Sequence, residues 1–235
     1  MENMNNMNNY ENDNMQNWQQ QEELPVYQRE LSGRQYNVLI GVHLLYGLAL
    51  TAFICMKLPY IMPQIYSVHP VAFTVGFFAI CLFGGVIGKR ENYILSFISY
   101  TLIVLAFGAS LSFTLLFYPV YLIFVAAILT FVVVLTMTVA AVFMPDAFLS
   151  LGKVLFISLI GLVIAESVCF FLGIFTPNFL LLIGIFIFSL YVGYDWARGQ
   201  QYPSLPSYAC YTALQLYMDI FNLFIRILRL MGRRR

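Results

Sequence analysis

The chain has 235 residues, of which 61% are hydrophobic and only 10% charged, and its net charge is +1. A soluble domain averages about 25% charged residues, so this composition and a mean hydropathy of +0.80 predict an integral membrane protein. The charge excludes nucleic acid as a partner, because phosphate binding needs a concentrated basic surface. The basic cluster at residues 233–235 is better suited to the anionic headgroups of a lipid bilayer.

The first 30 residues differ in composition from the remainder. Residues 1–30 are rich in Asn, Gln, Met and Glu, and such a segment cannot bury enough apolar surface to fold alone. We therefore predict a disordered cytosolic tail over residues 1–30 and a transmembrane domain over residues 31–235. The tail has no basic segment followed by an apolar one, so a cleaved signal peptide is not expected and the first span should direct insertion.

From residue 38 onward, apolar runs alternate with short polar or Pro-containing breaks. About 20 helical residues cross the hydrocarbon core of a bilayer. Continuously apolar runs favour helices over barrel strands, which would alternate in polarity. The sequence therefore predicts an all-α, polytopic membrane protein. Its seven expected spans are residues 38–57, 70–88, 94–114, 121–144, 152–174, 178–197 and 208–229.

The distribution of Lys and Arg predicts the orientation, because short cytosolic loops collect these residues. Seven spans place six of them on the side of the N-terminus and, among the loops, only Lys57 on the other, so the N-terminus should be cytosolic. These six are Arg29, Arg34, Lys89, Arg90, Lys153 and Arg198. The arginines after the last span do not fit this pattern. Either the last segment crosses and tolerates them, or it is re-entrant and returns the tail to the cytosol.

A polar stripe runs along the last predicted span. Residues three or four apart share one face of a helix, and steps of this size connect the polar side chains of the segment. They are Tyr208, Thr212, Gln215, Asp219, Asn222 and Arg226. Because lipid cannot form hydrogen bonds with these groups, the stripe should face other helices or water. Thr212, Gln215 and Asn222 are thus candidate pore-lining residues.

Asp219 is the costly member of this stripe. An aspartate near mid-span costs about 2.5–3.5 kcal/mol on insertion scales, so it needs a partner, a water-filled cavity or a bound proton. Asp195, at the end of the sixth span, is the candidate partner. Two adjacent carboxylates would share a proton, and once deprotonated they would form an anionic oxygen site suited to Ca²⁺. Alternatively, both acids serve packing alone.

Two segments resemble the transmembrane Bax inhibitor motif family, which includes Bax inhibitor and Lifeguard-like proteins. "IFSLYVGYDWARGQ" is similar to the family's helix ending in Tyr-Asp, and "ALQLYMDIFNLFIRILRLMG" to its Ala-Leu-x-Leu-Tyr-x-Asp-x-x-Asn-Leu-Phe signature. Weaker similarity lies in "MPDAFLSLGKVLF" and "GRQYNVLIGVHLL". The chain departs from the family at Trp196 and Ala197, where the family often has a small polar residue and Gln.

The resemblance implies a seven-helix bundle with a central last helix, acting as a pH-sensitive calcium leak that lowers store calcium and protects against cell death. It assigns the family's ion-binding and gating carboxylate pair to Asp195 and Asp219, and a latch arginine to Arg90. It also implies residence in the endoplasmic reticulum or Golgi, with the plasma membrane as an alternative. Ca²⁺ and protons would be the ions handled, and no resident cofactor is expected.

Glu166 is a further acid in an apolar run, and the family motif does not demand it. It could extend an ion path and line a pore, or bind a neighbouring hydroxyl group while protonated. The four cysteines lie far apart in apolar runs and resemble no metal or redox motif.

The sequence suggests three functional classes. The first is a cation leak gated by Asp195 and Asp219. The second is a non-conducting adaptor that regulates cell death through membrane protein partners or the tail. The third, an intramembrane enzyme, is disfavoured because no His-Glu-x-x-His or nucleophile motif is present, and because Tyr217 and Met218 stand where an aspartyl protease motif would need Gly before Asp219.

Overall fold

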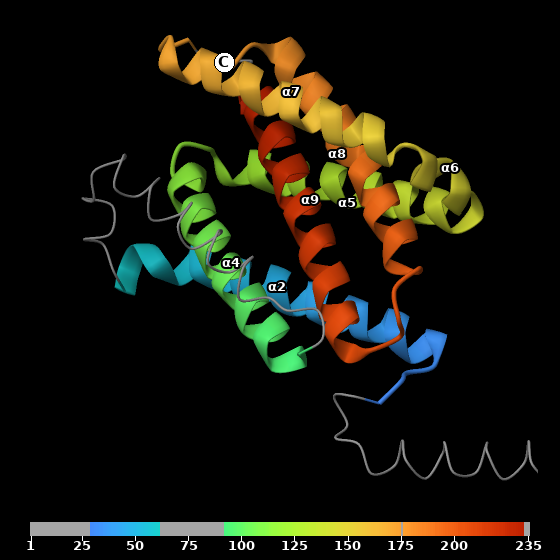
Figure 1. Ribbon diagram of the computed structural model, residues 1–235. Helices are drawn as coiled ribbons and strands as arrows, with labels where there is room; N and C mark the ends of the chain where they lie inside the picture. The colour runs from blue at the N-terminus through green and yellow to red at the C-terminus, as the bar shows by residue number, and fades with distance from the viewer. Residues whose placement is uncertain (1–28, 62–91, 175, 233–235) are drawn as a thin grey trace, which may run out of the picture.

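The computed structural model describes residues 29–61, 92–174 and 176–232, and every regular element in these ranges is α-helical (Figure 1). The all-α prediction is confirmed. The helices are α2 (Gly33–Ile61), α4 (Tyr93–Leu115), α5 (Val120–Phe143), α6 (Pro145–Ser150), α7 (Gly152–Phe171), α8 (Asn178–Gly199) and α9 (Pro206–Gly232). The expected second span, residues 70–88, lies outside the described residues. The short helix α6 was not predicted, because its sequence was interpreted as a break.

Among the described residues, five helices are long and apolar enough to cross a membrane, namely α2, α4, α5, α7 and α8. The chain is therefore a multi-pass membrane protein. Helix α9 is also long enough to cross, at 27 residues, but its polar and charged side chains lower its hydropathy. It is one continuous helix, so the segment does not turn back on itself as a re-entrant loop would.

Local sequence signals explain where several helices begin and end. Before α2, Ser32 and Gln35 form a capping box, in which each side chain bonds the backbone N–H of the other, at 3.3 Å and 3.0 Å. The Asn92 side chain accepts from the first backbone N–H groups of α4. Helix α7 ends at Phe171, and Gly173 follows its C-cap residue Leu172 with a φ of +66°, which suits the left-handed turn that closes a helix. This turn sends the chain back into α8.

Helix α9 occupies the centre of the bundle. It contacts α2, α4, α5 and α8, and Figure 1 shows it running between α4 and α8. Its apolar residues join three separate clusters: Leu223 and Leu228 pack with α5, α7 and α8, Tyr217 with α4, and Leu216 with α2 and α8. The expected central last helix is confirmed. A helix in this position buries polar side chains among protein atoms instead of lipid.

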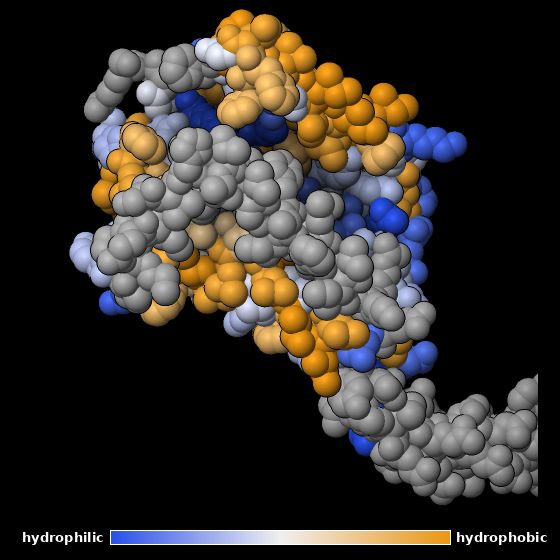
Figure 2. All heavy atoms as spheres, turned by 60° about the vertical axis from the view of Figure 1, so that its left-hand side comes forward, coloured by the Kyte–Doolittle hydropathy of each residue, from blue (hydrophilic) through white to orange (hydrophobic). Residues whose placement is uncertain are grey.

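The outer helices present apolar side chains outward. Helices α5 and α7 are the least buried of the five candidate spans: only 17% and 11% of the residues in their most apolar 18-residue stretches are buried. Figure 2 shows a broad apolar area at the top of the molecule, at the level of α7. Side chains such as Phe124 and Ile157 are 66% and 69% exposed. Lipid tails can cover such a surface because its apolar side chains need no hydrogen-bond partners, so the outer face fits a bilayer.

A glycine on α2 allows the closest packing between α2, α4 and α9. The Tyr100 hydroxyl group crosses from α4 to donate to the His43 carbonyl oxygen at 2.7 Å, and it passes directly over Gly47. A Cβ atom at Gly47 would lie 2.9 Å from Cζ of Tyr100 and 3.2 Å from Cδ2 of Tyr217. Both rings are almost fully buried, so neither can move away without disturbing the core.

We therefore expect Gly47→Ala to destabilise the protein by about 1–3 kcal/mol, the usual cost of overpacking. Gly41→Ala is the matched control on the same helix, because no described atom beyond its chain neighbours and its own helix backbone lies within 4 Å of its Cβ position and alanine favours helices over glycine. Thermal unfolding in detergent measures both. A Gly47→Ala melting temperature equal to that of Gly41→Ala would contradict the packing described.

Candidate functional site: an intramembrane carboxyl pair

Helices α8 and α9 run antiparallel and form an interface that we call the α8–α9 seam. It is defined by three contacts: Gly199 with Thr212, Asp195 with Asp219, and Phe188 with Arg226. Residue numbers rise along α9 as they fall along α8, as expected for helices joined by a short connection. The seam places much of the polar stripe of α9 against α8.

Asp195 and Asp219 meet in the middle of this seam. Their carboxyl groups lie close enough to hydrogen-bond one another, and each residue is only 5% exposed. Two buried carboxylates at this separation repel strongly when both are ionised. We therefore expect the pair to hold one proton between the two carboxyl groups.

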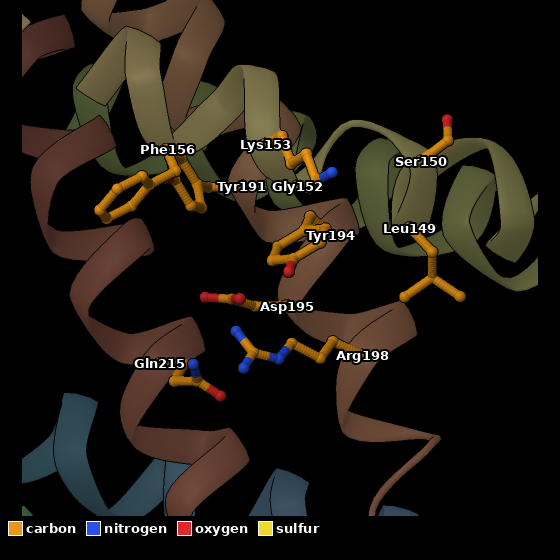
Figure 3. Close-up of a pocket in the computed structure, with 10 residues that line it drawn as sticks. All are labelled: Leu149, Ser150, Gly152, Lys153, Phe156, Tyr191, Tyr194, Asp195, Arg198 and Gln215. Carbon is orange, nitrogen blue, oxygen red and sulfur yellow. The ribbon is translucent and has the colours of Figure 1, made fainter. Parts of the chain in front are cut away.

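The pair borders an open cavity of about 700 Å³ between α6, α7, α8 and α9 (Figure 3). Asp195 lines it directly, and the figure shows the Arg198 guanidinium group and the Gln215 amide turned toward the same part of the space. The remaining lining residues are Leu149, Ser150, Gly152, Lys153, Phe156, Tyr191 and Tyr194. The cavity thus gives polar access to a carboxyl group in a mostly apolar bundle.

Two acceptor oxygens on α9 are buried and lack a hydrogen-bond partner among the described residues. They are Oδ2 of Asp219 and Oε1 of Gln215, one helical turn apart on the same face. A buried acceptor without a donor costs free energy. Oxygen atoms of this type are also the ligands that Ca²⁺ prefers. The described residues contain no group of three or more His, Cys, Asp or Glu side chains around one point, so water and amide oxygens would have to complete any cation site.

Other stripe residues have partners. The hydroxyl groups of Thr212 and Tyr36 lie 3.3 Å apart, and the Tyr36 hydroxyl group donates to the Gly199 carbonyl oxygen at 2.9 Å. The Asn222 amide donates to the Met218 carbonyl oxygen at 2.8 Å. These bonds tie α9 to its neighbours or to itself, so Thr212 and Asn222 contribute to packing in the described arrangement.

Glu166 lies away from the cavity and forms an ion pair with Arg226. The two guanidinium Nη atoms bond the two carboxylate oxygens, Nη2 to Oε2 at 3.1 Å. The sequence suggested an ion path or a hydroxyl partner for Glu166, and did not predict this arginine. The pair links α7 to α9 across α8.

The remaining predicted site residue, Arg90, lies outside the described residues. The described cation beside Asp195 is Arg198, which the sequence assigned only to the cytosolic side. Its position three residues after Asp195 on one helix face could have indicated this role. Lys153, assigned to the same side, lines the same cavity.

One of the two departures from the family motif, Ala197, is 2% exposed and packs with Ala141 and Phe148.

The helices, the cavity and the buried acids define a multi-pass helical membrane protein with an intramembrane carboxyl pair. A family model described as "Inhibitor of apoptosis-promoting Bax1" matches residues 31–235. The chain belongs to this Bax inhibitor family, as its motifs predict.

Curated bacterial relatives match part of the chain. The inner membrane protein YbhL of Escherichia coli is 35% identical over 94 residues, which cover 36% of this chain and 40% of that protein. An uncharacterized Helicobacter pylori protein is 33% identical over 102 residues, 41% of each chain. An uncharacterized membrane protein of Streptococcus pyogenes is 30% identical over 136 residues, 54% of this chain and 58% of that protein. The chain thus matches about half the length of these relatives.

The cavity should admit water to Gln215 but not to the core of the same helix. In a background without the native cysteines, we expect Gln215→Cys to react with a charged thiol reagent at least about tenfold faster than Leu223→Cys, since thiol reactivity follows exposure. Leu223 is fully buried in an apolar cluster. Labelling rates in reconstituted vesicles measure the difference, and equal rates would mean that the cavity is closed to water.

Proposed function

We propose that this protein is a pH-sensitive, calcium-permeable leak in which Asp195 and Asp219 bind and gate the ion. The observation that carries the proposal is the pair of carboxyl groups in the α8–α9 seam. Asp195 lines an open cavity, and Oδ2 of Asp219 and the nearby Oε1 of Gln215 are buried without donors among the described residues. A packing role alone gives no reason for the cavity or for the unpartnered oxygens. A site that alternates between a proton and a cation accounts for both.

The proposed gate follows from charge balance. At low pH, a proton bridges Asp195 and Asp219, which lowers their negative charge and holds α8 and α9 together. At higher pH, the pair loses this proton, and two carboxylates with the Gln215 amide oxygen form a hard oxygen site suited to Ca²⁺. Flux therefore rises as pH rises through the titration of the pair.

Cations near the pair would compete with Ca²⁺. Arg198 lies beside Asp195, and Lys153 lines the same cavity, while the Tyr191 and Tyr194 hydroxyl groups offer neutral polar contacts. In the family resemblance, Arg90 is the latch that pairs with Asp195 when the path is closed. These groups set how much negative charge the pair must gain before it binds a divalent ion.

The resemblance also suggests the physiological consequence. A leak of this kind in the endoplasmic reticulum or Golgi would lower stored calcium and protect against cell death, and in the plasma membrane it would carry the same ion. Membrane proteins that regulate cell death would be its partners. The proposed leak requires no enzymatic reaction. Protons and calcium are the ions that it would bind and conduct.

Flux into liposomes loaded with a calcium dye tests the proposal across a pH series. We expect Asp219→Asn and Asp195→Asn to lower calcium flux at least about tenfold and to flatten its pH dependence, because each removes an ionisable ligand. Ser189→Ala is the matched control on α8, since its hydroxyl group bonds only to the Ile185 carbonyl oxygen of its own helix.

If both aspartate variants conduct like the control at every pH, the proposed mechanism is wrong. If the unaltered protein carries no calcium, the non-conducting adaptor becomes the better interpretation. Deleting residues 1–30 then shows whether the adaptor acts through its tail. A leak should survive that deletion.

A further inference from the structure

A second pair of charges joins the α8–α9 seam to α7: Arg226 lies in the seam, and Glu166 lies on α7. Arg226 follows Asp219 by seven residues on α9, and Phe188 precedes Asp195 by seven residues on α8. The Arg226 guanidinium group lies over the Phe188 ring, 5.0 Å from its centroid. Seven residues are two helical turns, or about 10 Å at 1.5 Å per residue. The backbone of Arg226 therefore lies about 10 Å along α9 from that of Asp219. Its guanidinium group lies beside Gly184, which precedes Asp195 by eleven residues on α8, or about 16 Å along that helix.

A glycine makes room for the arginine. A Cβ atom at Gly184 would lie 2.7 Å from Cζ of Arg226, so a larger residue there would collide with the guanidinium group. The side chain crosses α8 at this point and reaches Glu166 on α7. The side chains of Arg226 and Glu166 are 9% and 27% exposed. Gly184 on α8 and Glu166 on α7 thus hold the Arg226 side chain in one orientation.

The charge of Arg226 opposes cation binding at the acid pair. At an effective dielectric constant of about 20, a positive charge about 16 Å away weakens binding of a divalent cation on the order of tenfold to a hundredfold. The Glu166 carboxylate cancels most of this field when it pairs with the arginine in a bidentate arrangement.

We infer that Glu166 promotes cation permeation by neutralising the charge of Arg226, so that the acid pair can accept calcium. This inference rests on the proposed function. Glu166 does not itself touch the ion: it acts through Arg226. The alternative is a mechanical lock, in which the ion pair only holds α7 against α9 and its loss would open the path.

Calcium flux into dye-loaded liposomes at a fixed pH where the unaltered protein conducts separates these two roles. We expect Glu166→Gln to lower flux at least about tenfold, because the charge of Arg226 is then uncovered. The double variant Glu166→Gln with Arg226→Gln removes both charges and should restore flux to within about threefold of the unaltered protein. A lock predicts that both variants leak more, because both lack the ion pair.

A buried arginine without a partner can also prevent folding, so gel filtration and thermal unfolding accompany each variant. If Glu166→Gln does not fold, the double variant decides: charge neutralisation predicts flux within about threefold of the unaltered protein, whereas a lock predicts a higher leak. A higher leak in the double variant, or unchanged flux in a folded Glu166→Gln, would overturn the inference.

The aspartate variants in the same assay keep the two claims apart. If Asp219→Asn abolishes flux while Glu166→Gln conducts normally, the calcium leak stands and the role of Glu166 fails. If Asp195→Asn and Asp219→Asn leave calcium flux and its pH dependence unchanged, the proposed function fails, and the inference about Glu166 fails with it.

Discussion

The structure depends on the burial of a polar helix inside an apolar bundle. Helix α9 carries one acid, two arginines and two side-chain amides, none of which lipid can solvate. The fold resolves this by surrounding α9 with α2, α4, α5 and α8, so that apolar helices face outward and polar groups face one another. Each polar group on α9 then needs a protein partner, a proton or water, and this requirement determines how α8 packs against it.

The α8–α9 seam meets the requirement in three different ways. Near Thr212, hydroxyl and carbonyl groups satisfy one another through Tyr36. At Arg226, an acid on α7 supplies the opposite charge. At Asp219 the partner is a second acid, an arrangement that is stable only with a shared proton or a bound cation. The first arrangement is a closed network. In the second, Nε of Arg226 is buried without a partner among the described residues. The third is open to a cavity and to exchange of its occupant.

Much of this fold follows from the sequence. Apolar runs gave spans at residues 178–197 and 208–229, close to the observed Asn178–Gly199 and Pro206–Gly232. The steps of three and four residues around Asp219 indicated the polar stripe, of which Thr212, Asp219 and Arg226 are buried. Apolar residues on the other faces of α9 are buried as well. The pair of Glu166 and Arg226 could not be foreseen, because the spacing of Glu166 along α7 does not say which side of that helix faces α9. The cavity beside Arg198 likewise depends on how α6 and α7 pack against α8.

The central claim is that Asp195 and Asp219 share a proton that a calcium ion displaces. Infrared difference spectroscopy of the reconstituted protein, with and without calcium at mildly acidic pH, observes that proton directly. The account predicts that calcium removes one protonated-carboxyl band, and that this band is absent when both aspartates are replaced by asparagine. A band that persists in that double variant, or one that calcium leaves unchanged in the unaltered protein, would contradict it.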